Sequence, residues 1–505
     1  MCIRDRICRW VSAVLLTLIG IETATAQDAI SVDQPVVQVQ VEPGLLKEPR
    51  DGRLYVLFSK SLAREPRQGP SWFGPEPFYG INLKAVQNGK TYVVDDESDG
   101  FPDAISELAA GTYAVQAIFD HDFYHSNHNN GVGNIYSDKV VVDWNPTDDG
   151  TKLLKLTLSH TIADRPFRNT QYAKQVKIYS PRLSAFHGHE VIQKAAVLLP
   201  ASYYDNPDKR YPVIYSVTGF GGMHESVEGS EPVPVEPGDV EFIRVILDGQ
   251  CKWGHHTYAN SAKNGPRGDA LVHELIPEIE RRFRTVAEST ARFLTGHSSG
   301  GWSSLWLQVN YPAQFAGTWS TAPDVVDFRD YQEVNLYHDP PLSLYTKPNG
   351  DRRGIARRGD QVLIWYDDFG KMDDCLGRGG QLRSFEAVFS PLDDFGQPIK
   401  MWTRDSGTVI PQTVKYWMEY DINHLIQRRW FKNEQHLKGK IHVIMGTLDT
   451  FYLEGACEQI KTTLAKLDPT AVIDMVEGDH GSFMTRAMRD RIRSEMSAAY
   501  RKFHD

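Results

Sequence analysis

The chain has 505 residues and a formal net charge of −10 at pH 7, from 55 Lys and Arg against 65 Asp and Glu. At about 150 residues per domain, this length predicts two to four domains. The acidic balance argues against a nucleic-acid binder, whose contact surface should be basic. A content of 41% hydrophobic and 24% charged residues is typical of a globular chain rather than a disordered one. The lack of an apolar run of about 18 residues excludes a polytopic membrane protein.

The first 26 residues have the pattern of a cleaved export signal. Three arginines precede the apolar stretch 11–21, which is short for a membrane span, and Ala24-Thr25-Ala26 supplies a small-residue cleavage site. The pattern predicts a secreted or periplasmic protein with no membrane span in the mature chain; a short membrane anchor is the alternative. In an oxidising compartment, one disulfide and one free thiol are expected from the three cysteines that remain: Cys251, Cys375 and Cys457.

Short alternating strands with turn residues between them fill the region from about residue 36 to 159. Leu54–Phe58 and Tyr113–Phe119 are examples, and Gly, Pro, Asn and Asp clusters separate such runs. Several short strands in succession predict a β-sandwich-like accessory domain, which we place at residues 27–165. It carries no assignable motif, so we expect it to fold separately and to supply no catalytic triad residue.

The pattern changes after about Tyr172, where apolar strand-like runs begin to alternate with helical segments. The runs at 213–217 and 242–247 are of the buried type. Alternating β and α elements predict an α/β fold, with an α/β sheet and crossover connections, over residues 166–505.

A G-x-S-x-G motif lies between a strand-like run and a helix-like segment, as Gly296-His297-Ser298-Ser299-Gly300. In the α/β-hydrolase architecture, this strand–turn–helix corner holds the nucleophilic serine out of the sheet. Glycines flank the serine because the corner is too tight for neighbouring Cβ atoms. Ser298 is therefore the predicted nucleophile; a glycine-rich turn with a structural serine is the alternative.

A serine nucleophile needs a base and an acid that orients the base, in the chain order Ser, Asp or Glu, His. Asp449 follows the apolar strand 441–445, at a strand end where α/β sheets place catalytic groups. His480 follows the next predicted strand, in a loop with glycine neighbours. The predicted triad is completed by Asp449 and His480, with Asp474 and Asp479 as lower-ranked acids.

Acyl transfer also needs N–H donors aimed at the developing oxyanion. The backbone N–H groups of Phe220 and Ser299 are the predicted donors, since a glycine-rich loop around Phe220 follows an earlier strand. Gly221 is the next candidate in that loop; a plain glycine-rich turn is the alternative. Gly221, His297 and Trp302 adjoin these groups and are the predicted substrate-binding residues.

The stretch between Ser298 and Asp449 is longer than a minimal hydrolase sheet needs. We expect an insertion at about 328–438 that forms a lid over the pocket. Its aromatic residues could line a site for an aromatic or bulky acyl group, or pack the lid on the sheet; they include Trp365, Tyr366, Trp402, Trp417 and Trp430.

Metal-binding motifs are incomplete in this sequence. His273-Glu274 begins like a helical zinc motif, but Pro277 occupies the position of the second histidine. A metal site is therefore not expected.

Several motifs together resemble the α/β-hydrolase esterases of the esterase D and feruloyl-esterase type. The resemblance covers roughly residues 172–325 and resumes around 440–500. It implies a serine hydrolase that acts on carboxylic esters without a cofactor. Members often have His where this chain has Thr218. The residues that carry the resemblance are Leu199-Pro200, Tyr211-Pro212-Val213, Gly219-Phe220-Gly221-Gly222, the Asn264 to Glu280 segment and Gly296 to Gly300.

The predicted function is that of an exported carboxylic ester hydrolase that uses a Ser-His-Asp triad and an acyl-enzyme intermediate. Its partner would be a small-molecule or polymer-linked ester, not a nucleic acid. The alternatives are a serine acyltransferase with a sugar or lipid acceptor and a catalytically weak polymer-binding protein. A prolyl-type peptidase usually carries a propeller, which needs more chain than the first part provides. The sequence leaves the oligomeric state and the native ester open.

Overall fold

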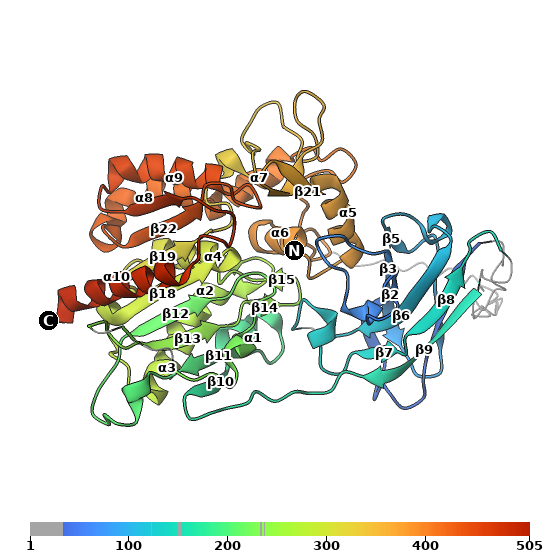
Figure 1. The fold of residues 1–505 in the computed structure, drawn as a ribbon, viewed down its shortest axis with the longest axis horizontal. Helices are drawn as coiled ribbons and strands as arrows, with labels where there is room; N and C mark the ends of the chain where they lie inside the picture. Colours follow the sequence, from blue (N-terminus) through green and yellow to red (C-terminus); the bar gives the residue numbers. More distant parts are fainter. Residues whose placement is uncertain (1–33, 123, 149–152, 233–234, 237, 505) are drawn as a thin grey trace, which may run out of the picture.

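The computed structural model describes residues 34–122, 124–148, 153–232, 235–236 and 238–504. The predicted signal peptide, residues 1–26, lies outside these ranges. Two parts lie side by side: an all-β part from the beginning of the described chain, and a larger α/β part (Figure 1). The segment between β19 and β22 adjoins both of them.

The all-β part, residues 36–161, is called the N-terminal β segment below. Hydrogen bonds join its strands into one branched sheet in the order β4-β1-β9-β7-β6-β2-β3-β5, with β8 also paired to β6. Its all-β character agrees with the sequence pattern, while a division into two stacked sheets stays a prediction. The strands are β1 (Val36–Val41), β2 (Arg50–Ser59), β3 (Phe78–Val86), β4 (Thr91–Val94), β5 (Asp99–Phe101), β6 (Gly111–Asp120), β7 (Ile135–Ser137), β8 (Val140–Trp144) and β9 (Leu153–Thr161).

The α/β part is built on an eight-stranded mixed sheet in the order β10-β11-β13-β12-β18-β19-β22-β23. β11 runs antiparallel to both of its neighbours, and the strands from β13 to β23 are parallel to one another. The central strands are continuous apolar runs because helices and loops cover both faces. The strands are β10 (Ala173–Tyr179), β11 (Ile192–Leu198), β12 (Val213–Val217), β13 (Ile243–Leu247), β18 (Arg292–His297), β19 (Gly317–Thr321), β22 (Ile441–Gly446) and β23 (Val472–Val476).

Helix α4 packs across β12, β18 and β19, and its side chains are buried on almost every side, as expected of a helix inside a large core. Within the described residues, no helix is both long and apolar enough to span a membrane. The helices are α1 (Pro181–His187), α2 (Arg267–Ala270), α3 (Ile276–Arg282), α4 (Ser299–Asn310), α5 (Tyr366–Leu376), α6 (Gln381–Phe389), α7 (Pro411–Trp417), α8 (Ile422–Leu437), α9 (Glu454–Leu467) and α10 (Arg486–His504).

The chain between β19 and β22 holds a two-stranded ribbon and four helices, α5 to α8. The ribbon consists of β20 (Gly354–Arg358) and β21 (Gln361–Trp365). Helix α5 contacts β3 and β5 of the N-terminal β segment, and α8 packs against α4. Two further ribbons precede α2: β14 (Gln250–Cys251) with β15 (Gly254–His255), and β16 (Asn260–Ser261) with β17 (Gly265–Pro266).

The N-terminal β segment has a hydrophobic core of its own and also packs against the core of the α/β part. Hydrogen bonds reinforce this contact: Arg53 Nη2 donates to the Cys375 carbonyl at 2.7 Å, and the Tyr55 hydroxyl donates to the Leu376 carbonyl at 2.7 Å. Buried side chains of the β segment that join the core of the α/β part are Tyr55, Leu57, Phe78, Phe101 and Ile118.

The prediction of a disulfide is wrong, because Cys251, Cys375 and Cys457 are all free and buried thiols. They lie on β14, α5 and α9, each within a different packed region. Burial raises the pKa of Cys251 to about 11 and that of Cys375 to about 12. Both side chains therefore stay as neutral thiols near pH 7.

Candidate active site

Ser298 lies at the tight corner between β18 and α4, as the motif predicts. Its backbone has φ 58° and ψ −125°, a strained conformation for a residue with a side chain. A Cβ added at Gly296 would lie 2.1 Å from the Gly300 carbonyl oxygen, and one at Gly300 would lie 2.2 Å from the Val217 carbonyl oxygen. Only glycine fits at both positions, so the motif sequence builds this corner directly.

Asp449 and His480 lie together at the same edge of the sheet, after β22 and β23. His480 Nδ1 donates a hydrogen bond to Asp449 Oδ2 at 2.7 Å. The Phe451 backbone N–H donates to Asp449 Oδ1 at 2.7 Å, and the Asp449 side chain is fully buried. With its proton held on Nδ1, the neutral imidazole has its Nε2 lone pair available as a base.

Opposing influences act on the pKa of His480. Burial disfavours the charged ring and lowers the pKa, whereas the hydrogen bond and the negative charge of Asp449 raise it, with a further contribution from the charge of Asp324. The balance leaves the pKa of His480 above its ordinary value of 6.5. This is the arrangement that an orienting acid requires, because a carboxylate bonded to Nδ1 fixes the tautomer and favours the imidazolium.

The two lower-ranked acids are engaged elsewhere. Asp474 pairs with Arg491 on α10. Asp479 lies on the surface, where its Oδ1 accepts the backbone N–H groups of Gly481 and Ser482. Of the three aspartates considered from the sequence, Asp449 is the one that bonds to the His480 ring in the described structure.

Ser298 and His480 line one cavity of about 280 Å³. The rings of His297 and His480 lie 4.8 Å apart, and the Phe451 ring stands edge-on to His480 at 4.9 Å. A mostly apolar cavity with a few convergent polar groups is the usual form of a small-molecule site. Its aromatic lining consists of Trp72, Phe220, Trp302, Phe328, Tyr331, Phe369, Phe385, Phe389 and Phe451.

The glycine-rich loop after β12 comes very close to the nucleophile. A Cβ added at Gly219 would lie 3.7 Å from Ser298 Cβ and 3.2 Å from the His297 carbonyl oxygen. Phe220 follows directly and lines the cavity. Ser299 is the first residue of α4, where a backbone N–H has no acceptor within the helix. Phe220 therefore borders the cavity, whereas Ser299 is not among the lining residues and directly follows Ser298, which is.

Two of the three predicted substrate-binding residues line the cavity, and the third does not. His297 and Trp302 line the cavity, whereas Gly221, with φ +77°, is not among its lining residues. Gly221 instead allows the loop to turn after Phe220. His297 Nδ1 bonds to the Thr321 hydroxyl at 3.0 Å, and burial lowers the pKa of His297 to about 4, so its ring is neutral near pH 7.

A second carboxylate, Asp324, lies beside the nucleophile and was missed from the sequence. Ser298 Oγ donates to Asp324 Oδ1 at 3.3 Å, so in this structure the hydroxyl bonds to Asp324. Asp324 Oδ2 accepts from Ser299 Oγ at 2.5 Å and from Gln381 Nε2 at 3.5 Å. Burial raises the pKa of Asp324 to about 6, against the lowering effect of these hydrogen bonds. Its position just after β19 obeys the strand-end rule that pointed to Asp449, and that rule could have found it.

Trp72 is the other missed residue, and it comes from the N-terminal β segment. Its ring centroid lies 5.4 Å from that of Phe220, 5.4 Å from that of Phe369 and 6.1 Å from that of Phe451. The β segment therefore supplies part of the cavity wall, while Ser298, Asp449 and His480 all lie in the α/β part. The surrounding Gly69-Pro70-Ser71-Trp72-Phe73-Gly74 stretch was the available signal, an aromatic pair inside a Gly- and Pro-rich loop.

The insertion contributes aromatic rings to the cavity, but not those singled out from the sequence. Those five are absent from the cavity lining; four are buried in packing, and Trp365 lies under the guanidinium of Arg352 at 4.9 Å. Phe369, Phe385 and Phe389, on α5 and α6, line the cavity instead. Aromatic content alone could not tell which rings face the site.

One group in the described chain has the composition of a metal site. His224 Nδ1 lies 2.9 Å from Asp248 Oδ2 and 3.0 Å from Glu225 Oε2. Burial lowers the pKa of His224, but the two carboxylates outweigh it and raise the pKa above 6.5. The arrangement suits a protonated imidazole held by two carboxylates. None of the three residues lines the catalytic cavity.

Comparison with known proteins agrees with this geometry. Residues 190–491 match the model of the family described as putative esterase. An esterase of Mycobacterium tuberculosis is 31% identical over 142 residues, which are 27% of this chain and 30% of that protein. An endo-1,4-beta-xylanase/feruloyl esterase of Xylanibacter ruminicola is 31% identical over 143 residues, 25% of this chain and 19% of that protein. The match therefore spans less than a third of either relative.

Among solved structures, an S-formylglutathione hydrolase from Agrobacterium tumefaciens aligns with 66% of this chain and 98% of its own, at 12% identity and a TM-score of 0.38. The family match covers more than half of the chain, including β12, the G-x-S-x-G corner, Asp449 and His480. The chain belongs to the esterase family of α/β-hydrolases.

Proposed function

We propose that the chain is an exported serine hydrolase that cleaves carboxylic esters with Ser298, His480 and Asp449. The observation that carries the proposal is the 2.7 Å hydrogen bond from His480 to buried Asp449, in a cavity that also holds Ser298 on its strained corner. Family membership favours the same chemistry. Export rests on the pattern of residues 1–26.

In this mechanism the Ser298 hydroxyl rotates from Asp324 toward His480 and attacks the ester carbonyl carbon. His480 Nε2 takes the hydroxyl proton, and Asp449 stabilises the imidazolium. The N–H groups of Phe220 and Ser299 stabilise the oxyanion. The C–O bond then breaks, His480 protonates the leaving alcohol, and water hydrolyses the acyl-enzyme by the same steps in reverse.

The aromatic lining supports an ester with an aromatic or bulky acyl group, free or linked to a polymer. Flat rings pack well on such walls, while a cavity of about 280 Å³ suits a group of one or two rings better than a long chain. The relative from Xylanibacter ruminicola is named as a feruloyl esterase, which agrees with this substrate class.

The test is Ser298→Ala, assayed on methyl ferulate and on p-nitrophenyl acetate. Loss of the nucleophile should lower kcat by at least about 10³-fold on both esters. Ser494→Ala, on the exposed face of α10, is the matched control and should keep wild-type turnover. Near-wild-type turnover by a folded Ser298→Ala protein would overturn the proposal. Product analysis with an added alcohol separates hydrolysis from acyl transfer.

A further inference from the structure

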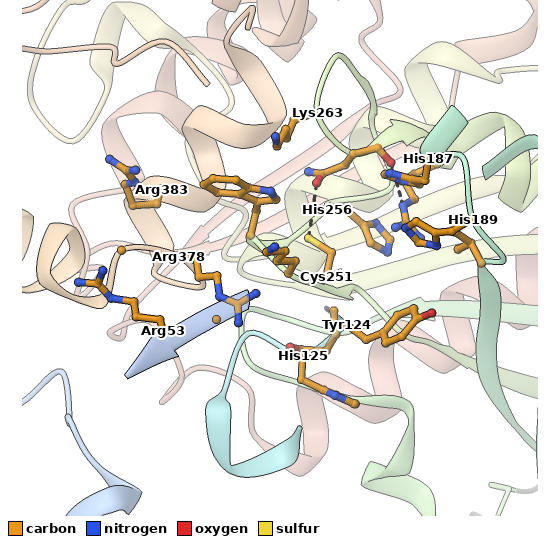
Figure 2. Close-up of a pocket in the computed structure, with 18 of the residues that line it drawn as sticks. Arg53, Tyr124, His125, His187, His189, Cys251, His256, Lys263, Arg378 and Arg383 are labelled. Carbon is orange, nitrogen blue, oxygen red and sulfur yellow. Dashed lines mark hydrogen bonds between the residues drawn. The ribbon is translucent and has the colours of Figure 1, made fainter. Parts of the chain in front are cut away.

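A second and larger cavity, of about 700 Å³, lies between the N-terminal β segment and the α/β part. It shares no lining residue with the catalytic cavity. In Figure 2, Arg53, Arg378 and Arg383 lie on one side of it, and His187 and His189 on the other. We call it the interdomain cavity; its walls come from β2, β3, β11, the β14–β17 region and the α5–α6 region.

The interdomain cavity is strongly cationic although the chain as a whole is acidic. Eight lysine and arginine side chains line it, against two carboxylates, Asp51 and Asp248. A concave surface lined by one sign of charge concentrates ligands of the other sign. The eight cationic residues are Arg53, Lys84, Lys194, Lys252, Lys263, Arg267, Arg378 and Arg383.

Ion pairs neutralise only part of this charge. Among the described residues, Arg53 pairs with Asp99, Lys84 with Asp51, Arg378 with Asp120, and Arg383 with Asp374. Of these carboxylates, only Asp51 belongs to the cavity lining.

Lys263 and Arg267 have no carboxylate within ion-pair distance among the described residues. Lys263 Nζ donates to the Gly396 carbonyl and lies 4.9 Å from the Trp253 ring. Arg267 Nε donates to the Asn264 carbonyl at 3.1 Å. Both positive charges are held by neutral groups, so neither is neutralised within the wall.

Several buried donors around the cavity also have no hydrogen-bond partner in the described structure. Arg53 is only 2% exposed, yet its Nε and Nη1 atoms are unpartnered. The Asn264 Nδ2 atom is likewise buried and unpartnered. These donor atoms have almost no accessible surface, so they lie within the cavity wall and do not themselves reach a ligand in the cavity.

Burial also lowers the pKa of two of these cationic side chains. Desolvation, with the nearby charges of Arg378 and Lys263, lowers the pKa of Lys252 to about 8. Desolvation likewise lowers the pKa of Arg267. An anion in the cavity would oppose both effects, because it would stabilise the charged forms.

We propose that the interdomain cavity is a binding site for a small organic polyanion, of a size between a disaccharide and a trisaccharide. Lys263, Arg267 and Arg378 would face its anionic oxygens, and Trp253 would pack against its carbon skeleton. Carboxylate and phosphate groups share the required chemistry, since both accept several charge-assisted hydrogen bonds. The site is independent of the catalytic cavity, so its test does not depend on ester hydrolysis.

The test is calorimetric titration of the full-length protein at pH 7 and low salt with three probes. Trigalacturonate supplies carboxylates, inorganic pyrophosphate supplies phosphates, and cellotriose is the neutral control. At least one anion should bind with a Kd below about 1 mM and more weakly as NaCl is added, whereas cellotriose should not bind. The anion that binds identifies the chemical source of the charge. No binding by either anion would overturn the proposal.

Variants then locate the binding. The double variant Lys263→Gln, Arg267→Gln should raise the Kd of the anion at least about tenfold, because charged hydrogen bonds to it are lost. Lys432→Gln, an exposed lysine on α8, is the control and should bind as wild type. If the double variant does not fold by circular dichroism, Lys263→Gln alone replaces it, with an expected loss of about threefold. Unchanged binding in a folded cavity variant would place the anion elsewhere and refute the site.

Discussion

Trp72→Ala tests whether the N-terminal β segment takes part in substrate selection. Trp72 is half-buried, lines the catalytic cavity, and contacts Phe220 and Phe369 with ring centroids 5.4 Å away. Its removal opens the wall that an aromatic acyl group would touch, but it leaves Ser298 and His480 in place. We therefore expect a loss that depends on the acyl group.

The size of the loss follows from the area of the missing contact. A tryptophan side chain can bury about 150–250 Å². If about 60 Å² of apolar contact with a feruloyl ring disappears, at about 25 cal/mol per Å², the loss is about 1.5 kcal/mol. This corresponds to about a tenfold lower kcat/KM for methyl ferulate. An acetyl group offers much less apolar surface for contact with Trp72, so p-nitrophenyl acetate should lose at most about twofold.

The assay compares kcat/KM for the two esters in Trp72→Ala and in Phe73→Ala. Phe73 is the adjacent aromatic residue, 48% exposed and absent from the cavity lining, and should change neither value. Equal losses on both esters would refute selection by acyl contact and assign Trp72 to positioning the Phe220 loop. Unchanged values for both would refute any part in the site.

Three further predictions concern the ionisable groups. Asp449→Asn should lower kcat by about 10⁴-fold, because the wrong tautomer of His480 is then favoured, whereas Asp474→Asn should stay within about twofold; comparable losses would contradict the assignment of the acid. The acid limb of kcat/KM should have its midpoint above pH 6.5, because the pKa of His480 is raised and its neutral form is the base; a midpoint below pH 6 would contradict this. Asp324→Asn should move that limb to lower pH, because a negative charge that raises the pKa of His480 is lost; an unmoved limb, measured between pH 5 and 8, would show that the two groups are uncoupled.

Local sequence patterns predicted the catalytic corner because its requirements are local. Backbone atoms a few residues away or on the adjoining strand leave no room for a Cβ at Gly296 and Gly300. The motif therefore predicts the geometry of the corner directly. Asp449 and His480 follow from chain order and from strand ends, which meet at one edge of a parallel sheet.

Local sequence patterns alone do not single out Trp72 and Asp324. Trp72 reaches the cavity only because the N-terminal β segment packs on the insertion, a contact between regions about 300 residues apart, such as Tyr55 and Leu376. No periodicity or motif encodes that docking. Asp324 follows a strand as Asp449 does, but in this chain order only its burial beside Ser298 distinguishes it from an ordinary turn aspartate.

The apolar contact between the N-terminal β segment and the core of the α/β part restricts how the molecule can move and unfold. Since Tyr55, Phe78 and Ile118 pack in the same cluster as the α/β core, the β segment cannot swing as a body tethered by a linker without exposing apolar surface. Hinge opening between the two parts is thereby suppressed, and thermal denaturation should involve both at once. A ligand that enters the cavity beside Ser298 would therefore do so without separation of the two parts.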